Sequence, residues 1–529
     1  MGKKLPMGIK IIAKRSLRAS VAPLLLWLMV IPSAMGELPP IIGVIRCDTS
    51  YTLFGHQISP LGDQNGDGRG DFAIWDYRFA AYFYHGGYPL DTQWAFRLDS
   101  VNDVWDIGDV SGDGIHDFVS LGRSQYHWKF GLYYGGAVLD TARKRCFGSD
   151  DNGALFPVAR GYDLNLNGSD ELIADAGQQR SVLLFELADP FDSMPAMTFR
   201  PYWFPGPGCT YGRGIATGDF NGDGVRDLVV CLTPDNVLSK GQISIYWGGA
   251  RFDTIPDLRF ADPGPWQDGS AYFGRVLANV GDVNDDGYED LLVGRDNAND
   301  NLMCVYFGGP TFDSIPDLVM HDGTDYARAV GDINGDGIAD FMTSLALQSS
   351  SYSYVNIYYG GSDIDTVVDL RVGVWDMPEY LLLFGQDMAG LGDVNGDSIG
   401  DFAISAGGDQ YGHGVVYVFA GKRSGTDVEE IDSPSLPASF TLSQNYPNPF
   451  NGATVIPFDL PRHSHAELSV YNLEGKLVTN LIDRELSAGM YRVTWNGRNN
   501  SGVPVASGVY FYRLSANTSV LSRKMLLLK

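Results

Sequence analysis

The chain has 529 residues and a formal net charge of −26, with 64 acidic against 38 basic residues. Phosphate binding needs a basic stripe that this composition lacks, which argues against nucleic acid as a partner. The segment from residue 37 to 439 alone carries a charge of −36, so the acidity there needs a local explanation.

The first 36 residues have the pattern of a secretory signal. Six basic residues and no acid precede an apolar run from Val21 to Ile31, and Ser33-Ala34-Met35-Gly36 follows, in which all residues but Met35 are small. A membrane anchor is the alternative, but a run of 11 residues is too short to cross about 30 Å of hydrocarbon. We therefore expect residues 1–36 to be a signal peptide cleaved after Gly36, with a secreted or surface-attached mature chain and no transmembrane segment after cleavage.

An aspartate-rich segment recurs seven times between residues 63 and 401. In the copy that begins at Asp332, side-chain oxygens stand at the first, third and fifth positions, Gly337 allows a tight bend, and Asp340 closes the segment at the ninth. Calcium takes about 6 to 8 oxygen ligands, and the backbone carbonyl of the seventh residue can add one. A single Asp/Asn/Gly cluster usually forms an ordinary turn. Repetition at spacings of 46 to 63 residues instead indicates stacked structural units.

We predict one Ca²⁺ per copy, up to seven in all. The expected ligands, in the order first, third, fifth, seventh (backbone carbonyl) and ninth position, are Asp63, Asn65, Asp67, Arg69 and Asp71; Asp109, Ser111, Asp113, Ile115 and Asp117; Asp163, Asn165, Asn167, Ser169 and Glu171; Asp219, Asn221, Asp223, Val225 and Asp227; Asp282, Asn284, Asp286, Tyr288 and Asp290; Asp332, Asn334, Asp336, Ile338 and Asp340; Asp393, Asn395, Asp397, Ile399 and Asp401.

Apolar segments between the copies predict β-strands. Each copy runs into a short apolar strand, and most are followed by an aromatic strand that ends in a glycine pair, as at 133–136, 245–249, 306–309 and 358–361. A further motif of the type Phe252-Asp253-Thr254-Ile255-Pro256-Asp257-Leu258 follows six of the copies but not the last. A spare strand stands ahead of the first copy, at Ile41–Ile45. Four strands in each of seven units predict an all-β fold, a seven-bladed β-propeller in which the two ends of the chain pair.

These residues resemble FG-GAP repeats, found in the propeller of integrin α-subunits and in many bacterial surface proteins. The resemblance covers roughly residues 41 to 421 and rests on Phe-Gly before the loop (Phe54-Gly55, Phe273-Gly274, Phe384-Gly385), the aspartate-rich loop and the aromatic strand. It implies calcium at the positions given above. The copy at Asp163 departs from the pattern with Asn167 and Glu171, and the copy at Asp393 has Ser398 in place of glycine. These two sites are expected to be the weakest.

The propeller is expected to span 37–421 and a Ser/Pro-rich acidic linker to span 422–439. The segment 440–529 opens with Asn445-Tyr446-Pro447-Asn448-Pro449-Phe450-Asn451 and closes with Ser507-Gly508-Val509-Tyr510. It is similar to the C-terminal sorting domain of type IX secretion substrates, a small Ig-like β-sandwich. The resemblance implies export through an outer membrane by secretion machinery that recognises this domain. The alternative is an Ig-like module that merely ends the protein.

Two classes of function remain open. The preferred hypothesis is a non-catalytic, calcium-binding propeller that binds an extracellular protein or glycan. The alternative is a polysaccharide lyase or hydrolase whose site is built from residues far apart in the sequence, since no Walker loop or HExxH motif is present. The adhesive tripeptide Arg69-Gly70-Asp71 is discounted, because Asp71 is expected to close its own loop.

Overall fold

A computed structural model describes residues 38–528 except for short stretches, namely 47–53, 125–126, 137–144, 148–154, 177–179, 188–193, 202–208, 235–240, 262–271, 297–301, 322–325, 347–352, 378–380, 408–412, 423–427, 432–436, 438, 452–453, 487, 500–504 and 517–518. The expected signal peptide lies outside the described residues. No helix within the described ranges is long and apolar enough to span a membrane.

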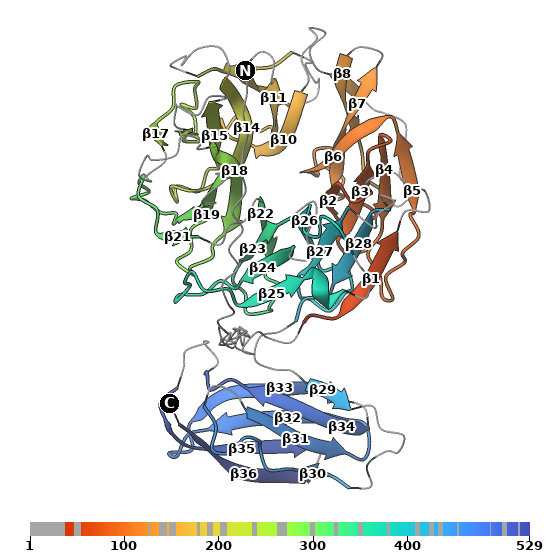
Figure 1. Ribbon diagram of the computed structural model, residues 1–529, viewed down its shortest axis with the longest axis vertical. Helices are drawn as coiled ribbons and strands as arrows, with labels where there is room; N and C mark the ends of the chain where they lie inside the picture. Colours follow the sequence, from red (N-terminus) through yellow and green to blue (C-terminus); the bar gives the residue numbers. More distant parts are fainter. Residues whose placement is uncertain are drawn as a thin grey trace, which may run out of the picture. The chain divides into compact units, whose positions relative to one another are not determined.

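The described strands form nine four-stranded antiparallel sheets, seven of which lie between residues 41 and 419. Figure 1 shows these seven sheets arranged as blades around a common axis. The first six blades, from the innermost strand outward, are β2 (Gln57–Gly62), β3 (Asp71–Asp76), β4 (Ala80–Tyr84) and β5 (Phe96–Asp99); β6 (Val101–Gly108), β7 (Asp117–Ser124), β8 (His127–Tyr133) and β9 (Arg145–Phe147); β10 (Leu155–Tyr162), β11 (Glu171–Ala176), β12 (Ser181–Glu186) and β13 (Met197–Phe199); β14 (Cys209–Gly218), β15 (Asp227–Pro234), β16 (Gln242–Tyr246) and β17 (Leu258–Ala261); β18 (Tyr272–Gly281), β19 (Asp290–Asp296), β20 (Leu302–Tyr306) and β21 (Leu318–Met320); β22 (Tyr326–Gly331), β23 (Asp340–Leu345), β24 (Tyr354–Tyr358) and β25 (Leu370–Gly373). A short 3-10 turn, η2 (Val374–Asp376), follows β25.

The seventh blade draws its strands from both ends of the propeller chain. It contains β26 (Met388–Gly392), β27 (Asp401–Ala406) and β28 (Val415–Phe419), and its outer strand is β1 (Ile41–Arg46). Residues of β1 pair antiparallel with β28, with Val44 opposite Tyr417. The spare strand at the start of the chain therefore supplies the strand that the last repeat lacks, as the sequence predicted.

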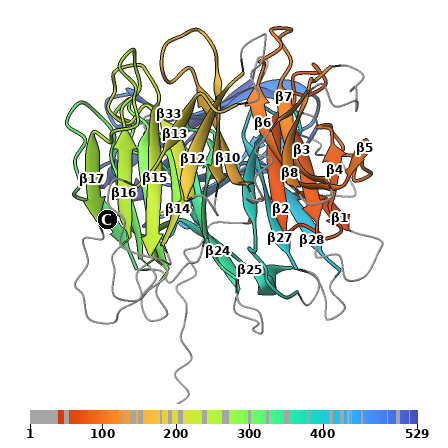
Figure 2. The ribbon, with the colours of Figure 1, turned by 90° about the horizontal axis from the view of Figure 1, so that it is seen from above.

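Adjacent blades bury the apolar strands between them. In β15, Leu228 and Val230 pack in a cluster with residues of the third blade, whereas Val229 and Cys231 pack in a cluster with residues of the fifth. Figure 2 shows the strands of this fourth blade side by side in the order β17, β16, β15 and β14. Because successive side chains of a strand point to opposite faces, both faces must be apolar. Each fully buried aliphatic side chain contributes about 1.5–3 kcal/mol to this packing.

The aromatic strands fill these cores, as expected. Phe341 at the start of β23 stacks on Tyr358 at the end of β24, with ring centroids 4.9 Å apart and planes inclined by 10°. The first and second blades hold the same stacked Phe–Tyr pair in the same register, and the seventh holds Phe402 stacked on Phe419. The Phe-Gly motif has a related role. Phe273 is fully buried, and Gly274 has φ +86, where a Cβ atom would lie 2.7 Å from the Cβ atom of Cys231 in the preceding blade.

The C-terminal segment folds as the expected Ig-like sandwich of two sheets. One contains β29 (Val428–Ile431), β34 (Gly489–Trp495), β31 (Thr454–Leu460) and β30 (Thr441–Leu442), and the other β33 (Leu477–Leu486), β32 (Ser464–Tyr471), β35 (Gly508–Ala516) and β36 (Ser519–Leu527). Tyr512 joins the opening motif to this core, because its hydroxyl accepts from the N–H of Asn445 and donates to the carbonyl of Ser443. The opening motif is thus packed into the fold of the domain.

Part of the segment expected as a linker is a strand. Residues 428–431 pair antiparallel with β34, Val428 opposite Val493 and Ile431 opposite Met490. The acidic, Ser/Pro-rich composition of this segment indicated an unstructured connection. Its strand forms because the edge of β34 offers backbone hydrogen-bond partners, and these lie too far along the chain for the local composition to indicate them. Charged residues are usual on such edge strands.

Candidate functional site: seven aspartate-rich loops

Every expected calcium loop connects the innermost strand of its blade to the second strand. In the sixth blade, β22 ends at Gly331, the loop begins at Asp332, and β23 begins at Asp340. The same connection occurs in all seven blades. Because each loop follows the same strand, the seven loops lie at one end of the propeller.

The first aspartate of each loop caps the turn. Asp332 accepts through Oδ1 from the N–H groups of Gly335 (2.6 Å) and Asp336 (3.1 Å), and through Oδ2 from that of Gly337 (2.8 Å). Equivalent bonds are made by Asp63, Asp109, Asp163, Asp219, Asp282 and Asp393. The chain therefore wraps around this carboxylate.

The third and fifth side chains hold the next part of the turn in the same way. Asn334 accepts from the N–H of Asp336 at 3.0 Å, and Asp336 accepts from the N–H of Ile338 at 2.9 Å. The Asn bond recurs at Asn65, Asn165, Asn221, Asn284 and Asn395. The bond from the seventh to the fifth residue recurs at Arg69, Ile115, Ser169, Val225, Tyr288 and Ile399. The second blade has Ser111 in place of this Asn, and its hydroxyl instead lies 3.4 Å from Asp109 Oδ1.

The ninth, closing carboxylate is buried. Asp340 accepts through Oδ2 from the N–H of Ile333 and through Oδ1 from that of Gly360, both at 2.9 Å. Asp71, Asp117, Asp227, Asp290 and Asp401 also accept from the N–H of a glycine and of the second or third residue of their own loop, and Asp401 accepts from both of these loop residues. Glu171 accepts from the N–H of Leu164 and from the side chain of Asn165.

The sequence reading missed the role of the glycine pairs. The first glycine, such as Gly360, donates to the closing carboxylate of its own blade. The second donates to the preceding blade's loop, as Gly361 does to the carbonyl of Val283 at 2.9 Å. Gly360 also needs to lack a side chain, because a Cβ atom there would lie 2.3 Å from the carbonyl oxygen of Ala339. The recurrence of glycine pairs downstream of most loops was the available signal.

Burial disfavours the ionised form of several closing carboxylates. Burial raises the pKa of Asp340 to about 8, and the charges of Asp336 and Asp332 contribute further. Burial likewise raises the pKa of Asp227 and of Asp290 to about 7, and that of Glu171 to about 8. A nearby cation would favour the ionised form of each group and offset both burial and repulsion.

These loops fit a hard cation in the chemistry of their donors. All the side chains offered are oxygen donors, and a carboxylate oxygen that accepts one N–H keeps a second lone pair. Among the described residues, no three His, Cys, Asp or Glu side chains already form a metal cluster. A complete shell would therefore need the Asn oxygens and the seventh carbonyl as well. The assignment of these residues as calcium ligands stays a prediction.

The two loops expected to be weak differ in kind. In the seventh blade, Ser398 takes the glycine conformation, with φ +66, and its N–H still bonds to Asp393 Oδ2 at 2.7 Å. In the third blade the set of oxygen donors itself changes, because Asn167 and Glu171 stand where the other loops have aspartate, and Asn167 Nδ2 bonds to Glu186 Oε1 at 3.1 Å. The backbone of the third loop is also strained at Leu166, with φ +57.

The discounted Arg69-Gly70-Asp71 tripeptide is placed as expected. Asp71 has 2% of its side chain exposed, and its two oxygens accept from Gln64 and Gly86. The carboxylate is therefore part of its own loop and is not presented to a receptor.

The fold and the loops together define a seven-bladed β-propeller with an aspartate-rich loop in every blade, followed by an Ig-like sandwich. The segment 443–519 matches the FlgD Ig-like domain family. Integrin alpha-5 of Xenopus laevis is 26% identical over 261 residues, which are 46% of this chain and 22% of that protein. Integrin alpha-V of Gallus gallus is 26% identical over 265 residues, 49% of this chain and 20% of that protein. The repeats are thus integrin α-like, although the matched part is only about a fifth of these relatives' length.

Among solved structures, a chain from an active polycomb repressive complex 2 in the basal state aligns with 74% of this chain at 8% identity, with a TM-score of 0.45. A TM-score below 0.5 does not establish a shared fold.

Proposed function

We propose that this protein is an extracellular calcium-binding propeller that serves as an interaction module for a protein or glycan ligand. The observation that carries the proposal is the sevenfold recurrence of one oxygen-rich loop geometry in a propeller with integrin α-like repeats. Calcium is the cation that such donors favour, and it is plentiful outside cells, where loops of moderate affinity are filled.

The cation's contribution in this proposal is mechanical. A bound ion supplies positive charge at the centre of each turn. The loop residues hold that centre in place, and the hydrogen bonds between glycine pairs and preceding loops transmit its rigidity to the next blade. Rigid blades would present loops between strands as a preorganised binding surface, which reduces the entropy lost on binding.

The C-terminal sandwich is proposed to direct export. The support is its similarity to sorting domains of type IX substrates and the built-in position of the opening motif, where Asn445 is 2% exposed. Fusing residues 428–529, which include strand β29 of the sandwich, to a periplasmic reporter in a host with that secretion system tests this part. Surface appearance of the reporter is expected, and retention in the periplasm would count against it.

The ligand-binding proposal is tested with the mature chain on arrays of glycans and extracellular proteins. We expect binding that is lost in EDTA and restored by added calcium. Binding that ignores the chelator, or no binding on any array, would contradict the proposal. The Asp223→Ala and Asp336→Ala variants, each lacking one loop carboxylate, provide intermediate cases.

A further inference from the structure

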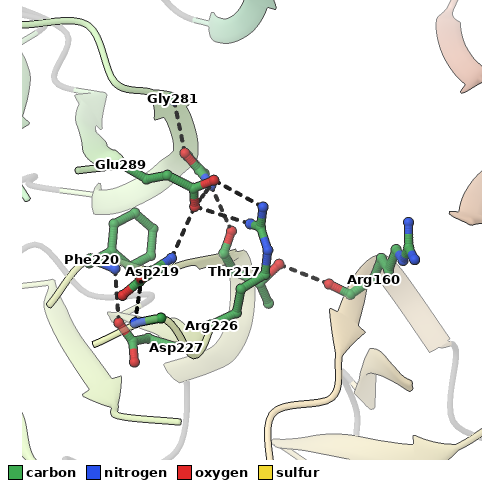
Figure 3. Close-up of polar contacts among 10 residues, drawn as sticks. Arg160, Thr217, Asp219, Phe220, Arg226, Asp227, Gly281 and Glu289 are labelled. Atoms are coloured by element: carbon green, nitrogen blue, oxygen red, sulfur yellow. Dashed lines mark hydrogen bonds and ion pairs between the residues drawn. The ribbon is translucent and has the colours of Figure 1, made fainter. Parts of the chain in front are cut away.

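The fourth and fifth blades are joined by a polar network that reaches into a loop backbone. Glu289 stands at the eighth position of the fifth blade's loop. Its Oε2 accepts from the backbone N–H of Asp219, the first residue of the fourth blade's loop, at 2.9 Å (Figure 3). In the described part of the chain, the other loops show no such side-chain bond from the next blade to their first residue.

Several donors hold the Glu289 carboxylate in this place. Arg226 binds it through both terminal nitrogens, at 3.1 and 2.9 Å, and Asn279 donates to Oε2 at 2.8 Å. Asn279 also donates to the carbonyl of Thr217 at 3.0 Å. The space exists because residue 218 is glycine, where a Cβ atom would lie 2.9 Å from Glu289 Oε2.

The third blade orients the arginine. The guanidinium carbon of Arg226 lies 4.1 Å from the ring centroid of Tyr162, and that of Arg160 lies 4.2 Å from the same centroid. Tyr162 has φ +55 at a register where Gly62, Gly108, Gly281, Gly331 and Gly392 stand in other blades. A non-glycine residue is strained in this conformation, and the ring of Tyr162 is held there between the two guanidinium groups that stack on it.

The eighth position differs elsewhere in the propeller. In the second and third blades, His116 and Asp170 pair with Asp106 and Arg160 of their own blades. In the sixth, seventh and first blades the residue is Ala339, Gly400 and Gly70, which have no side chain to reach a neighbour. The bridge from one loop to the preceding loop is therefore specific to the fourth and fifth blades.

We propose that Glu289 is a positioning residue for the cation loop of the fourth blade, and that it makes the loops of the fourth and fifth blades bind cations as a coupled pair. The inference rests on the proposed calcium function. Glu289 lies between Tyr288 and Asp290, two expected ligands of the fifth loop. A cation there fixes both neighbours, and with them the carboxylate that holds Asp219. By reciprocity, a cation in the fourth loop strengthens binding in the fifth by the same factor.

Terbium, which takes the same oxygen donors as calcium, offers a signal for the fourth loop. Trp247 directly precedes Gly248, whose N–H binds the closing Asp227. The glycine pairs of the other blades with this motif are preceded by His85, Tyr134, Phe307 and Tyr359. The part of the tryptophan-sensitised terbium emission that both Trp247→Phe and Asp223→Ala remove therefore reports the fourth loop.

The experiment is a double-mutant cycle on the mature chain, read by this emission. Asp286→Ala disables the fifth loop and is expected to weaken terbium binding to the fourth loop at least fivefold. Glu289→Ala is expected to do the same, and the combination should weaken it no further. Glu289→Gln, which keeps an acceptor for the Asp219 N–H, should retain part of the affinity. Arg97→Ala, which removes an exposed ion pair with Asp99 on β5, is the control and should change nothing.

A purely structural brace would give another result. If Glu289→Ala lowered the melting temperature but left the fourth-loop affinity unchanged, or if Asp286→Ala removed one terbium ion without affecting the fourth loop, the coupling would be disproved. If the parent chain bound neither terbium nor calcium, the proposed function itself would fail, and the coupling with it. Circular dichroism on each variant shows that folding is retained, and Glu289→Gln replaces the alanine variant if that one unfolds.

Discussion

The backbone N–H of Gly87 in the first blade donates to the carbonyl oxygen of Val394 in the seventh, at 2.7 Å. Val394 is the second residue of the seventh blade's loop. Gly136, Gly249, Gly309 and Gly361 make the same bond to the loops of the blades that precede them. Each of these loops is therefore part of the interface between two blades as well as a turn within one.

Removing divalent cations is expected to lower the thermal stability of the mature chain strongly. A ligand that binds only the folded state adds about 2.7 kcal/mol per site at a hundredfold excess over Kd. Calorimetric melts in excess EDTA and in millimolar calcium measure the difference. Magnesium, which demands a stricter octahedral geometry, serves as the control and should restore less stability. An identical melt in EDTA and calcium would refute the mechanical role given to the cation.

Gly414→Ala is expected to destabilise the interface between the seventh and first blades. A Cβ atom at this position would lie 1.7 Å from the carbonyl oxygen of Phe54, in the Phe-Gly motif of the first blade. Backbone atoms cannot give way as a flexible side chain can, so the loss should be about 3 kcal/mol or more. Urea unfolding monitored by circular dichroism measures it.

The matched control is Gly87→Ala, because a Cβ atom at residue 87 would have the carbonyl oxygen of Pro89 as its nearest neighbour, at 3.6 Å, an ordinary contact. Its stability should stay within about 0.5 kcal/mol of the parent. Equal stability of the two variants would show that the close approach at Phe54 relaxes without cost.

Much of this architecture could be predicted from sequence because it repeats. Seven loops in one register fixed the number of blades, and the absence of a fourth strand after Phe419 assigned Ile41–Ile45 to the last sheet. The bonds from glycine pairs to neighbouring loops could not be predicted, because they join residues of different repeats whose contact depends on the packed blades. For the same reason the strand at 428–431 was read as a linker.

Two loops also depart from the repeat at a position that is not an expected calcium ligand. Leu166 and Asp285 occupy a loop position where five other copies have glycine, and both adopt positive φ. The loop therefore keeps its positive φ at this position even where the side chain makes that conformation unfavourable. Strict alignment of the fourth loop position would have identified both residues, whereas a search for expected ligands did not.

Asp340→Ala is expected to destabilise the protein even without calcium. The substitution leaves the N–H groups of Ile333 and Gly360 without the carboxylate that binds them inside a buried turn. Each unsatisfied buried donor costs about 1–3 kcal/mol. Chemical unfolding in EDTA isolates this effect from that of the ion.

Asp253→Ala is the matched control for that experiment. Asp253 also accepts a backbone N–H, that of Ile255, but on an exposed turn where water can replace it. Its loss should be at most about 1 kcal/mol. If both variants lost the same stability in EDTA, burial of the closing carboxylate would not be the cause.

The pH dependence of stability should change sign with calcium. In the metal-free protein, the pKa values of Asp340 and Glu171 are raised to about 8, and those of Asp227 and Asp290 to about 7, in each case chiefly by burial. Their ordinary values are 3.8 for Asp and 4.5 for Glu. Between about pH 4 and pH 8 the native state therefore binds more protons than the unfolded chain, so its free energy of unfolding rises as the pH falls.

Calcium reverses this relation because the ion binds the ionised carboxylates and competes with protons. In saturating calcium, lowering the pH through the same window should release ions and reduce the free energy of unfolding. Urea titrations at several pH values, in EDTA and in calcium, give the two slopes directly. Asp340→Asn removes one titrating group and should flatten the EDTA slope while leaving its sign. Slopes of the same sign in both media would mean that the closing carboxylates do not hold the cation, because only their shared use by proton and metal makes the two slopes oppose each other.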